Sequence, residues 1–140
     1  MRYKITVEYD GTHLVGWQKQ KDGASAQEFL EKAILGFSHQ TTEVFGAGRT
    51  DAGVHALAQV AHFDLDIDLS EYKIMESLNA LLRELQAPVS VLQAEKVTGY
   101  FHARFSAVGR GYIYRILNRR GPSPLLVDRV WRVPYPLDIE

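Results

Sequence analysis

The segment best suited to chemistry runs from Gly46 to His55 and reads GAGRTDAGVH. Its three glycines within eight residues allow the backbone to turn sharply or to approach another group closely. Among them stands the polar triplet Arg49, Thr50 and Asp51. In loops of this kind an Asp most often bonds the backbone of its own turn. The spacing therefore indicates a tight loop with an ionised carboxylate and does not by itself assign a reaction.

Two phosphate-binding loops are excluded by the residues around Gly53. A Walker loop ends in Gly-Lys-Ser/Thr, whereas Val54 and His55 follow Gly53 here. The dinucleotide-binding fingerprint needs its third glycine three residues after the second, and Gly53 comes five residues after Gly48. Neither class of nucleotide-binding loop fits this segment.

The chain offers little for metal or thiol chemistry. It has no cysteine, which excludes thiol catalysis and cysteine-based zinc sites. His55 and His62 lie seven residues apart with no acidic or thiol companion at ligand spacing, so we expect no metal site.

For His102, a structural hydrogen bond and a contact with RNA both stay open. For Trp17, packing against a sheet is favoured over stacking on RNA.

The elements that must position the loop can be predicted from hydrophobic periodicity. Alternation over residues 2–9 and at 61–67 indicates strands, and residues 42–45 and 89–94 indicate two more. Helical spacing begins after Ser25, which forms a capping-box pattern with Glu28, and recurs from Ile74 to Leu85 before Pro88. The order strand, helix, strand, strand, helix, strand predicts an α+β, ferredoxin-like fold with two helices on one face of an antiparallel sheet.

Two further strands are expected in the last third of the chain. Gly111–Asn118 is predicted to extend the sheet, and Val130–Val133 to add a short strand. With 140 residues, 46% of them hydrophobic, the chain fits one soluble globular domain over residues 1–140. Its apolar runs are too short for a signal peptide or a membrane span, so no membrane association and a cytoplasmic location are expected.

Charge is distributed unevenly along the chain. Residues 1–100 hold nine Lys or Arg against fourteen Asp or Glu, whereas residues 101–140 hold seven Arg against three acids. Arginine suits phosphate recognition because its planar guanidinium donates two parallel hydrogen bonds. From charge alone, however, an ordinary solvated basic face is favoured.

Several blocks of residues then point to a family. They are EYDG at 8–11, GWQKQ at 16–20, GRTDAGVH at 48–55 and FHARFSA at 101–107, followed by Tyr112 and Tyr114. In sequence and order these blocks resemble the TruA family of tRNA pseudouridine synthases. Four separate matches in the same order argue against a chance similarity. The resemblance extends from residue 8 to residue 118.

The resemblance implies an isomerase that converts uridine to pseudouridine at positions 38 to 40 of the tRNA anticodon stem-loop, a step in tRNA processing that needs no cofactor. Asp51 matches the family's catalytic nucleophile. One carboxylate can suffice because the bond from ribose to base breaks and re-forms at a ring carbon without redox change. A uridine stacked in a helix must first be extruded into a pocket.

The resemblance also implies roles for other residues. Arg49 would bind substrate and pair with the catalytic carboxylate, and Tyr112 would pack against the target base. Without the resemblance, Tyr112 would be interpreted as a core tyrosine of a strand. With tRNA as the partner, Arg104, Arg110 and Arg115 become candidate RNA contacts.

Members of this family are longer than this chain, which corresponds to their N-terminal half; the full-length protein is expected to be a homodimer. Two alternatives stay open. One is a half-enzyme that is inactive on its own. The other is a non-catalytic RNA-binding module with a ferredoxin-like fold, although residues 61–64 lack the aromatic signature of RRM domains.

Overall fold

The computed structural model describes the whole chain, residues 1–140, which divides into two compact units. We call them unit 1 (Met1–Val108) and unit 2 (Gly109–Glu140). The division falls inside the segment predicted as one domain. Unit 1 contains both helices and the larger sheet, and unit 2 contains a two-stranded sheet.

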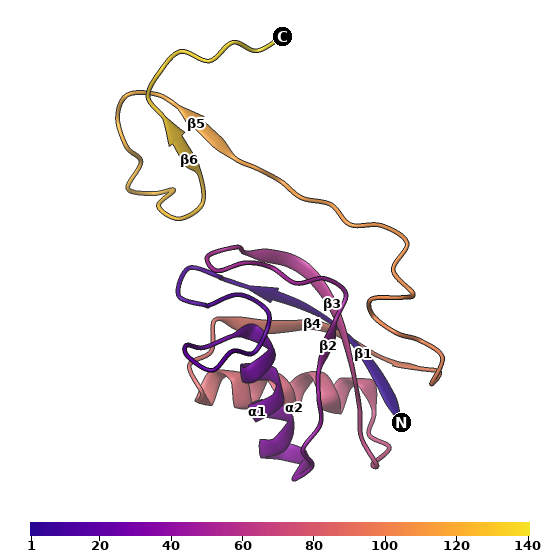
Figure 1. The fold of residues 1–140 in the computed structure, drawn as a ribbon. Coiled ribbons are helices and arrows are strands. Elements are labelled where there is room, and N and C mark those ends of the chain that lie inside the picture. The colour runs from indigo at the N-terminus through magenta and orange to yellow at the C-terminus, as the bar shows by residue number, and fades with distance from the viewer. The chain divides into compact units, whose positions relative to one another are not determined.

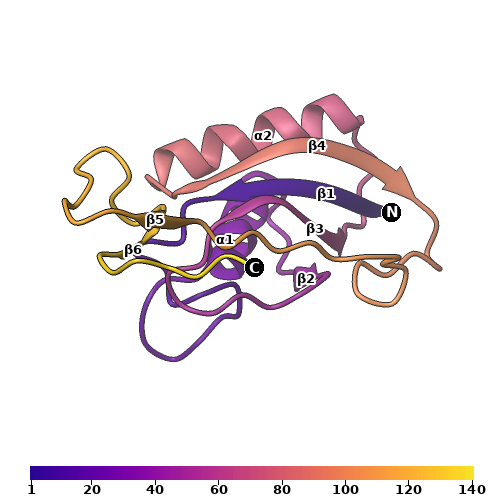
Figure 2. The same ribbon diagram turned by 90° about the horizontal axis from the view of Figure 1, so that it is seen from above.

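Unit 1 has the predicted ferredoxin-like α+β fold. In chain order its elements are β1 (Arg2–Tyr9), α1 (Ala26–Ser38), β2 (Phe45–Gly46), β3 (Ala56–Asp64), α2 (Glu71–Glu84) and β4 (Val89–Val97). The four strands are antiparallel neighbours in the order β2-β3-β1-β4. Figure 1 shows both helices on one side of this sheet, and Figure 2 shows the strand order from above. The other sheet face carries no helix in unit 1.

The core of unit 1 lies between the sheet and the helices. The alternating residues Tyr3, Ile5 and Val7 of β1 are fully buried there, as the predicted period of two requires. Each helix begins at a serine cap: the Ser25 hydroxyl accepts from the Glu28 N–H, and the Ser70 hydroxyl accepts from the Lys73 N–H, both at 3.1 Å. Neither helix is long and apolar enough to cross a membrane.

Strand β3 lies earlier in the chain than the predicted span of 61–67. Its last residue, Asp64, pairs with Arg2, the first residue of β1, so the sheet ends there. Leu65 still donates its N–H to the Met1 carbonyl, but Ile67 has left the sheet and accepts a hydrogen bond from the Tyr3 hydroxyl. The alternation of apolar residues continues past the point where β1 can supply hydrogen bonds.

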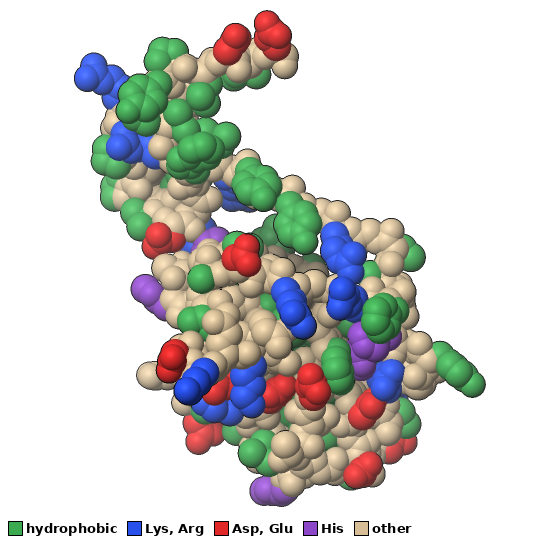
Figure 3. Space-filling model, in the orientation of Figure 1, with side chains coloured by type: hydrophobic (Ala, Val, Ile, Leu, Met, Phe, Trp, Pro, Cys, Tyr) green, Lys and Arg blue, Asp and Glu red, His purple; other side chains and the backbone are tan.

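Unit 2 differs from its prediction. Strand β5 covers only Ile116–Asn118, and it pairs in parallel with β6 (Trp131–Val133) in a sheet of their own. The segment 111–118 therefore does not extend the larger sheet as predicted. Alternation indicates a strand but does not choose its partner. Many apolar side chains of unit 2 stand at its surface beside arginines, as Figure 3 shows in green and blue.

Candidate active site

The loop between β2 and β3 presents Asp51 to solvent. Both Asp51 and Arg49 are exposed. The loop turns at Asp51 through a backbone bond, in which the Val54 N–H donates to the Asp51 carbonyl at 3.2 Å. The Asp51 carboxylate makes no hydrogen bond or ion pair within the protein. Asp51 therefore does not stabilise its turn through its side chain, and the carboxylate is available to another molecule.

The backbone at residues 50 and 51 is fixed by the segment that follows β1. Gly16 and Asp51 form an antiparallel bridge, and the Trp17 N–H donates to the Thr50 carbonyl at 3.1 Å. Gly16 has φ +117°, and a Cβ atom there would lie 2.4 Å from the Thr50 carbonyl oxygen. Only glycine permits both this conformation and this close approach.

A part-buried pair of hydroxyls holds Thr50 through its side chain. The Tyr9 hydroxyl and the Thr50 Oγ1 atom are 2.7 Å apart, although 41 positions separate the residues. Tyr9 is the last residue of β1 and is 2% exposed. Its ring packs against that of Trp17, with the ring centroids 6.1 Å apart. Trp17 is itself 2% exposed, so the prediction that it packs rather than stacks on RNA is confirmed.

The far end of the loop is anchored by His55. The Gly11 N–H donates to His55 Nδ1 at 2.9 Å, and that nitrogen lies 3.2 Å from Asp10 Oδ1. A Cβ atom on Gly11 would lie 2.0 Å from the Val54 carbonyl oxygen, so the two segments touch through their backbones. His55 thus has a structural partner, and the turn formed by Asp10 and Gly11 after β1 supports this end of the loop.

The predicted pairing of Arg49 with Asp51 is absent. The structure contains no ion pair or hydrogen bond between these two side chains, although only Thr50 separates them in the chain. Residues two apart share a face only in a regular strand. Arg49–Asp51 lies outside the strands, so closeness in sequence does not bring the two side chains together. Arg49 and Asp51 remain two exposed charges of the same loop.

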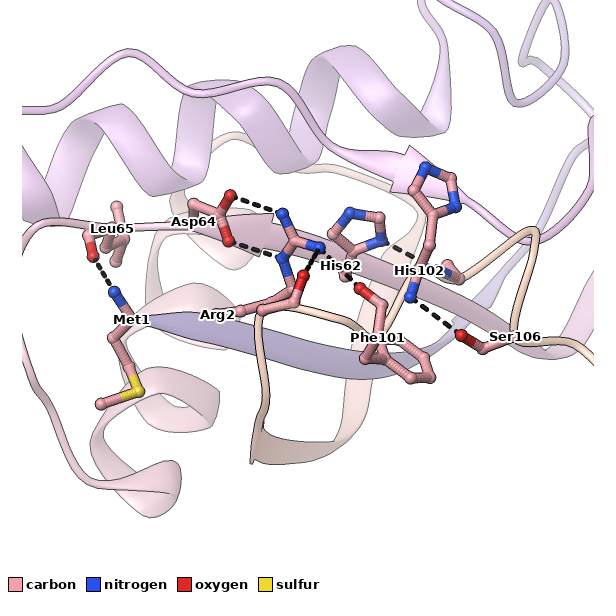
Figure 4. A network of polar contacts seen from close by, with 10 residues as sticks. Met1, Arg2, His62, Asp64, Leu65, Phe101, His102 and Ser106 are labelled. Atoms are coloured by element: carbon pink, nitrogen blue, oxygen red, sulfur yellow. Dashed lines mark hydrogen bonds and ion pairs between the residues drawn. The ribbon is translucent and has the colours of Figure 1, made fainter.

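Arg104 lies in a second segment of unit 1, which side chains of the two inner strands β1 and β3 hold by hydrogen bonds. Arg2 forms a bidentate pair with Asp64, with N–O distances of 2.8 and 2.9 Å. It also donates from Nη1 to the carbonyls of Gly99 and Phe101. Figure 4 shows this network, in which the loop after β4 folds back onto β1 and β3. Sequence reasoning did not anticipate the role of Arg2.

His62 and His102 continue this contact. His62 is 1% exposed, and its Nδ1 atom accepts from the Ala103 N–H at 3.0 Å. Burial, with smaller contributions from the neighbouring Arg2 and His102, lowers the pKa of His62 to about 4. His102 Nδ1 accepts from the Arg104 N–H at 3.2 Å, so the structural alternative for His102 is observed. Arg104 itself is exposed.

The remaining predicted site residues belong to unit 2. Tyr112 is 66% exposed and lies outside any strand, so its interpretation as a core tyrosine is wrong. Arg110 and Arg115 are likewise exposed. Unit 1 therefore carries Asp51, Arg49 and Arg104, and unit 2 carries the other three.

The supporting residues of the loop were not predicted as a group. Periodicity places Tyr9 on the buried face of β1, and a buried phenol needs a hydrogen-bond partner. That requirement was the available signal, but it does not say that the partner is Thr50, far along the chain.

Fold and site together define an α+β protein of ferredoxin-like architecture that displays a carboxylate at the tip of a backbone-anchored loop. Residues 5–106 match the family model described as tRNA pseudouridine synthase. The chain belongs to this family. The matched span includes the whole Asp51 loop, its supports in and after β1, and the segment of Arg104.

Individual relatives agree with the family match. The chain is 52% identical over 141 aligned positions to tRNA pseudouridine synthase A of Ehrlichia chaffeensis, covering 100% of this chain and 57% of the relative. It is 53% identical over 139 positions to tRNA pseudouridine synthase A of Rhodospirillum centenum, covering 99% and 56%. The chain thus spans a little over half the length of these curated relatives.

Proposed function

We propose that the protein containing this chain is a tRNA pseudouridine synthase, acting on uridines at positions 38 to 40 of the anticodon stem-loop with Asp51 as nucleophile. The observation that carries the proposal is the Asp51 carboxylate, which is exposed and without a protein partner on a loop whose backbone is anchored at several points. Membership of the family and the names of the relatives support the choice of reaction.

The chemistry requires one nucleophile and no redox partner. The carboxylate attacks the ribose C1′ atom, the bond from C1′ to N1 of uracil breaks, and its electron pair stays on the base. After the base turns within the pocket, C5 bonds to C1′ and the carboxylate leaves. C5 loses a proton and N1 gains one, so the product is an isomer of the substrate.

The other predicted residues take roles around this step. Arg49 would contact the RNA backbone, because no intramolecular ion pair with Asp51 engages it in this structure. Tyr112 would pack against the extruded base, and Arg104, Arg110 and Arg115 would contact phosphates. The homodimer of the complete protein stays a prediction from the family resemblance, and its cytoplasmic location stays a prediction from the short apolar runs of the sequence.

The proposal is tested by mapping pseudouridine in an unmodified tRNA anticodon stem-loop. The complete gene product, its Asp51→Asn variant and the 140-residue chain are assayed side by side. Asp66→Asn is the matched control, because Asp66 is an exposed carboxylate in a loop of unit 1 outside the site. We expect Asp51→Asn to abolish product and Asp66→Asn to leave the rate unchanged. Activity that survives Asp51→Asn would sink the assignment of the nucleophile.

The same assay separates the alternatives. A complete protein that binds the stem-loop but forms no pseudouridine would be the non-catalytic RNA-binding module. A 140-residue chain that is inactive while the complete protein is active would be the half-enzyme that cannot act alone.

A further inference from the structure

The Asp51 carboxylate has no side-chain contact to aim it, so its direction depends on the backbone of residue 51. Two sets of backbone contacts hold it in place. Gly16 bridges to Asp51 itself, and the Val54 N–H closes the turn on the Asp51 carbonyl. Because Thr50 directly precedes Asp51, contacts that fix Thr50 also fix the position of the Asp51 carboxylate.

Two buried residues, Tyr9 and Trp17, each form a hydrogen bond with Thr50. Its carbonyl accepts from Trp17 N–H at 3.1 Å, and its Oγ1 atom lies 2.7 Å from the Tyr9 hydroxyl. Tyr9 and Trp17 also pack against each other. The three residues close a ring of contacts in which the Tyr9 hydroxyl is the link between β1 and the Thr50 side chain.

We propose that Tyr9 is a positioning residue, whose buried hydroxyl aims Asp51 through Thr50. The inference rests on the proposed function for its catalytic consequence. A nucleophile works only within a narrow range of distance and direction, and a displacement of roughly 1 Å can cost about a hundredfold in rate. Loss of the hydrogen bond between Tyr9 and Thr50 makes the position of the carboxylate less precise but leaves the carboxylate present. The loss therefore affects the chemical step.

The chain supplies a matched control in Tyr3. Tyr3 and Tyr9 lie on the same strand and the same buried face, and each has a hydrogen-bonded hydroxyl. The Tyr3 hydroxyl, however, shares its proton between the Ile67 and Leu69 carbonyls, at 3.2 and 3.0 Å, and accepts from the Leu69 N–H at 2.7 Å, at the end of β1 away from the Asp51 loop. Tyr3→Phe and Tyr9→Phe each remove one hydrogen-bonded phenol oxygen from the buried face of β1, at opposite ends of the strand.

The experiment compares kcat and KM for the anticodon stem-loop in the complete gene product carrying Tyr9→Phe, Tyr3→Phe, Thr50→Val or Thr50→Ser. We expect kcat to fall about tenfold in Tyr9→Phe and Thr50→Val with KM little changed. Tyr3→Phe should keep the wild-type kcat, and Thr50→Ser, which keeps a hydroxyl, should recover most of it. The double variant Tyr9→Phe with Thr50→Val should lose no more than either single variant.

A second measurement does not depend on activity. Hydrogen exchange of the 140-residue chain should speed up at Trp17 and across residues 47–55 in Tyr9→Phe, and should stay unchanged there in Tyr3→Phe. An unchanged kcat in Tyr9→Phe, or an equal loss in Tyr3→Phe, would overturn the positioning role. An inactive wild-type protein would instead refute the proposed function, and the exchange comparison would still decide whether the Tyr9 hydroxyl orders the loop.

Discussion

His62 Nδ1 accepts a hydrogen bond from the Ala103 N–H at 3.0 Å, and this bond joins the C-terminal part of β3 to the segment that carries Arg104. A nitrogen that accepts must be unprotonated. His62 is almost fully buried, and this desolvation, more than the nearby positive charge of Arg2, keeps its pKa at about 4. The imidazole is therefore neutral at physiological pH and acts here as a structural acceptor.

The first prediction concerns the pH dependence of stability. The folded pKa of His62, about 4, lies below its ordinary value of 6.5, so the unfolded chain binds the proton more tightly. The stabilisation is fully present above pH 6.5 and is lost as pH falls from there towards 4. The free energy of unfolding should drop by about 3 kcal/mol at most across this window because of His62.

Urea denaturation of the 140-residue chain at intervals between pH 4 and pH 7 measures this loss. His62→Asn retains an acceptor near the position of Nδ1 but cannot be protonated there, so its pH dependence should be shallower. His13→Asn is the control, because His13 is exposed. Equal slopes for the wild type and His62→Asn would contradict the prediction.

The second prediction concerns two glycines that both have positive φ. Gly16 has φ +117° and would place a Cβ atom 2.4 Å from the Thr50 carbonyl, whereas Gly53 has φ +84° and open space around it. Gly53→Ala should cost only backbone strain, about 1 kcal/mol. Gly16→Ala adds a collision with backbone that cannot move aside, and it should cost about 3 kcal/mol or more.

The midpoints of urea denaturation for the two variants test this difference. If Gly16→Ala were no more destabilising than Gly53→Ala, the close approach of the Gly16 segment to the Asp51 loop would be disproved. Hydrogen exchange at residues 47–55 then shows whether the loop itself has shifted.

The third prediction concerns the arginines of unit 2. If Arg110 and Arg115 contact tRNA phosphates, replacing both with Glu should weaken binding of the anticodon stem-loop. It should also reduce the slope of log K against log salt by about two, because each lost phosphate contact removes roughly one unit. Affinity measured at several salt concentrations gives both quantities.

The matched control replaces Lys73 and Arg83 on α2 with Glu. This changes the net charge by the same amount, on the helical side of unit 1. A similar loss in that control would indicate a general charge effect. An unchanged slope in Arg110→Glu with Arg115→Glu would rule out these phosphate contacts.

The sequence by itself was enough to predict the ferredoxin-like fold of unit 1 and the place of the Asp51 loop. The reason is that both depend on short-range rules. Alternation put Tyr3 and Ile5 on the buried face of β1, and Ser25 marked the start of α1 through a bond to a residue only three positions away. Glycine spacing marked the loop because a sharp turn is a local property of the backbone.

Only the tertiary structure decided which residues hold that loop and what charge His62 carries. The bonds from Tyr9 to Thr50 and from Ala103 to His62 each span 41 positions, and no local pattern encodes such a pairing. Strand partners are equally non-local, so alternation in 111–118 did not reveal that β5 pairs with β6. The carboxylate of Asp51 was visible in the sequence, whereas the buried contacts that aim it exist only once distant segments pack together.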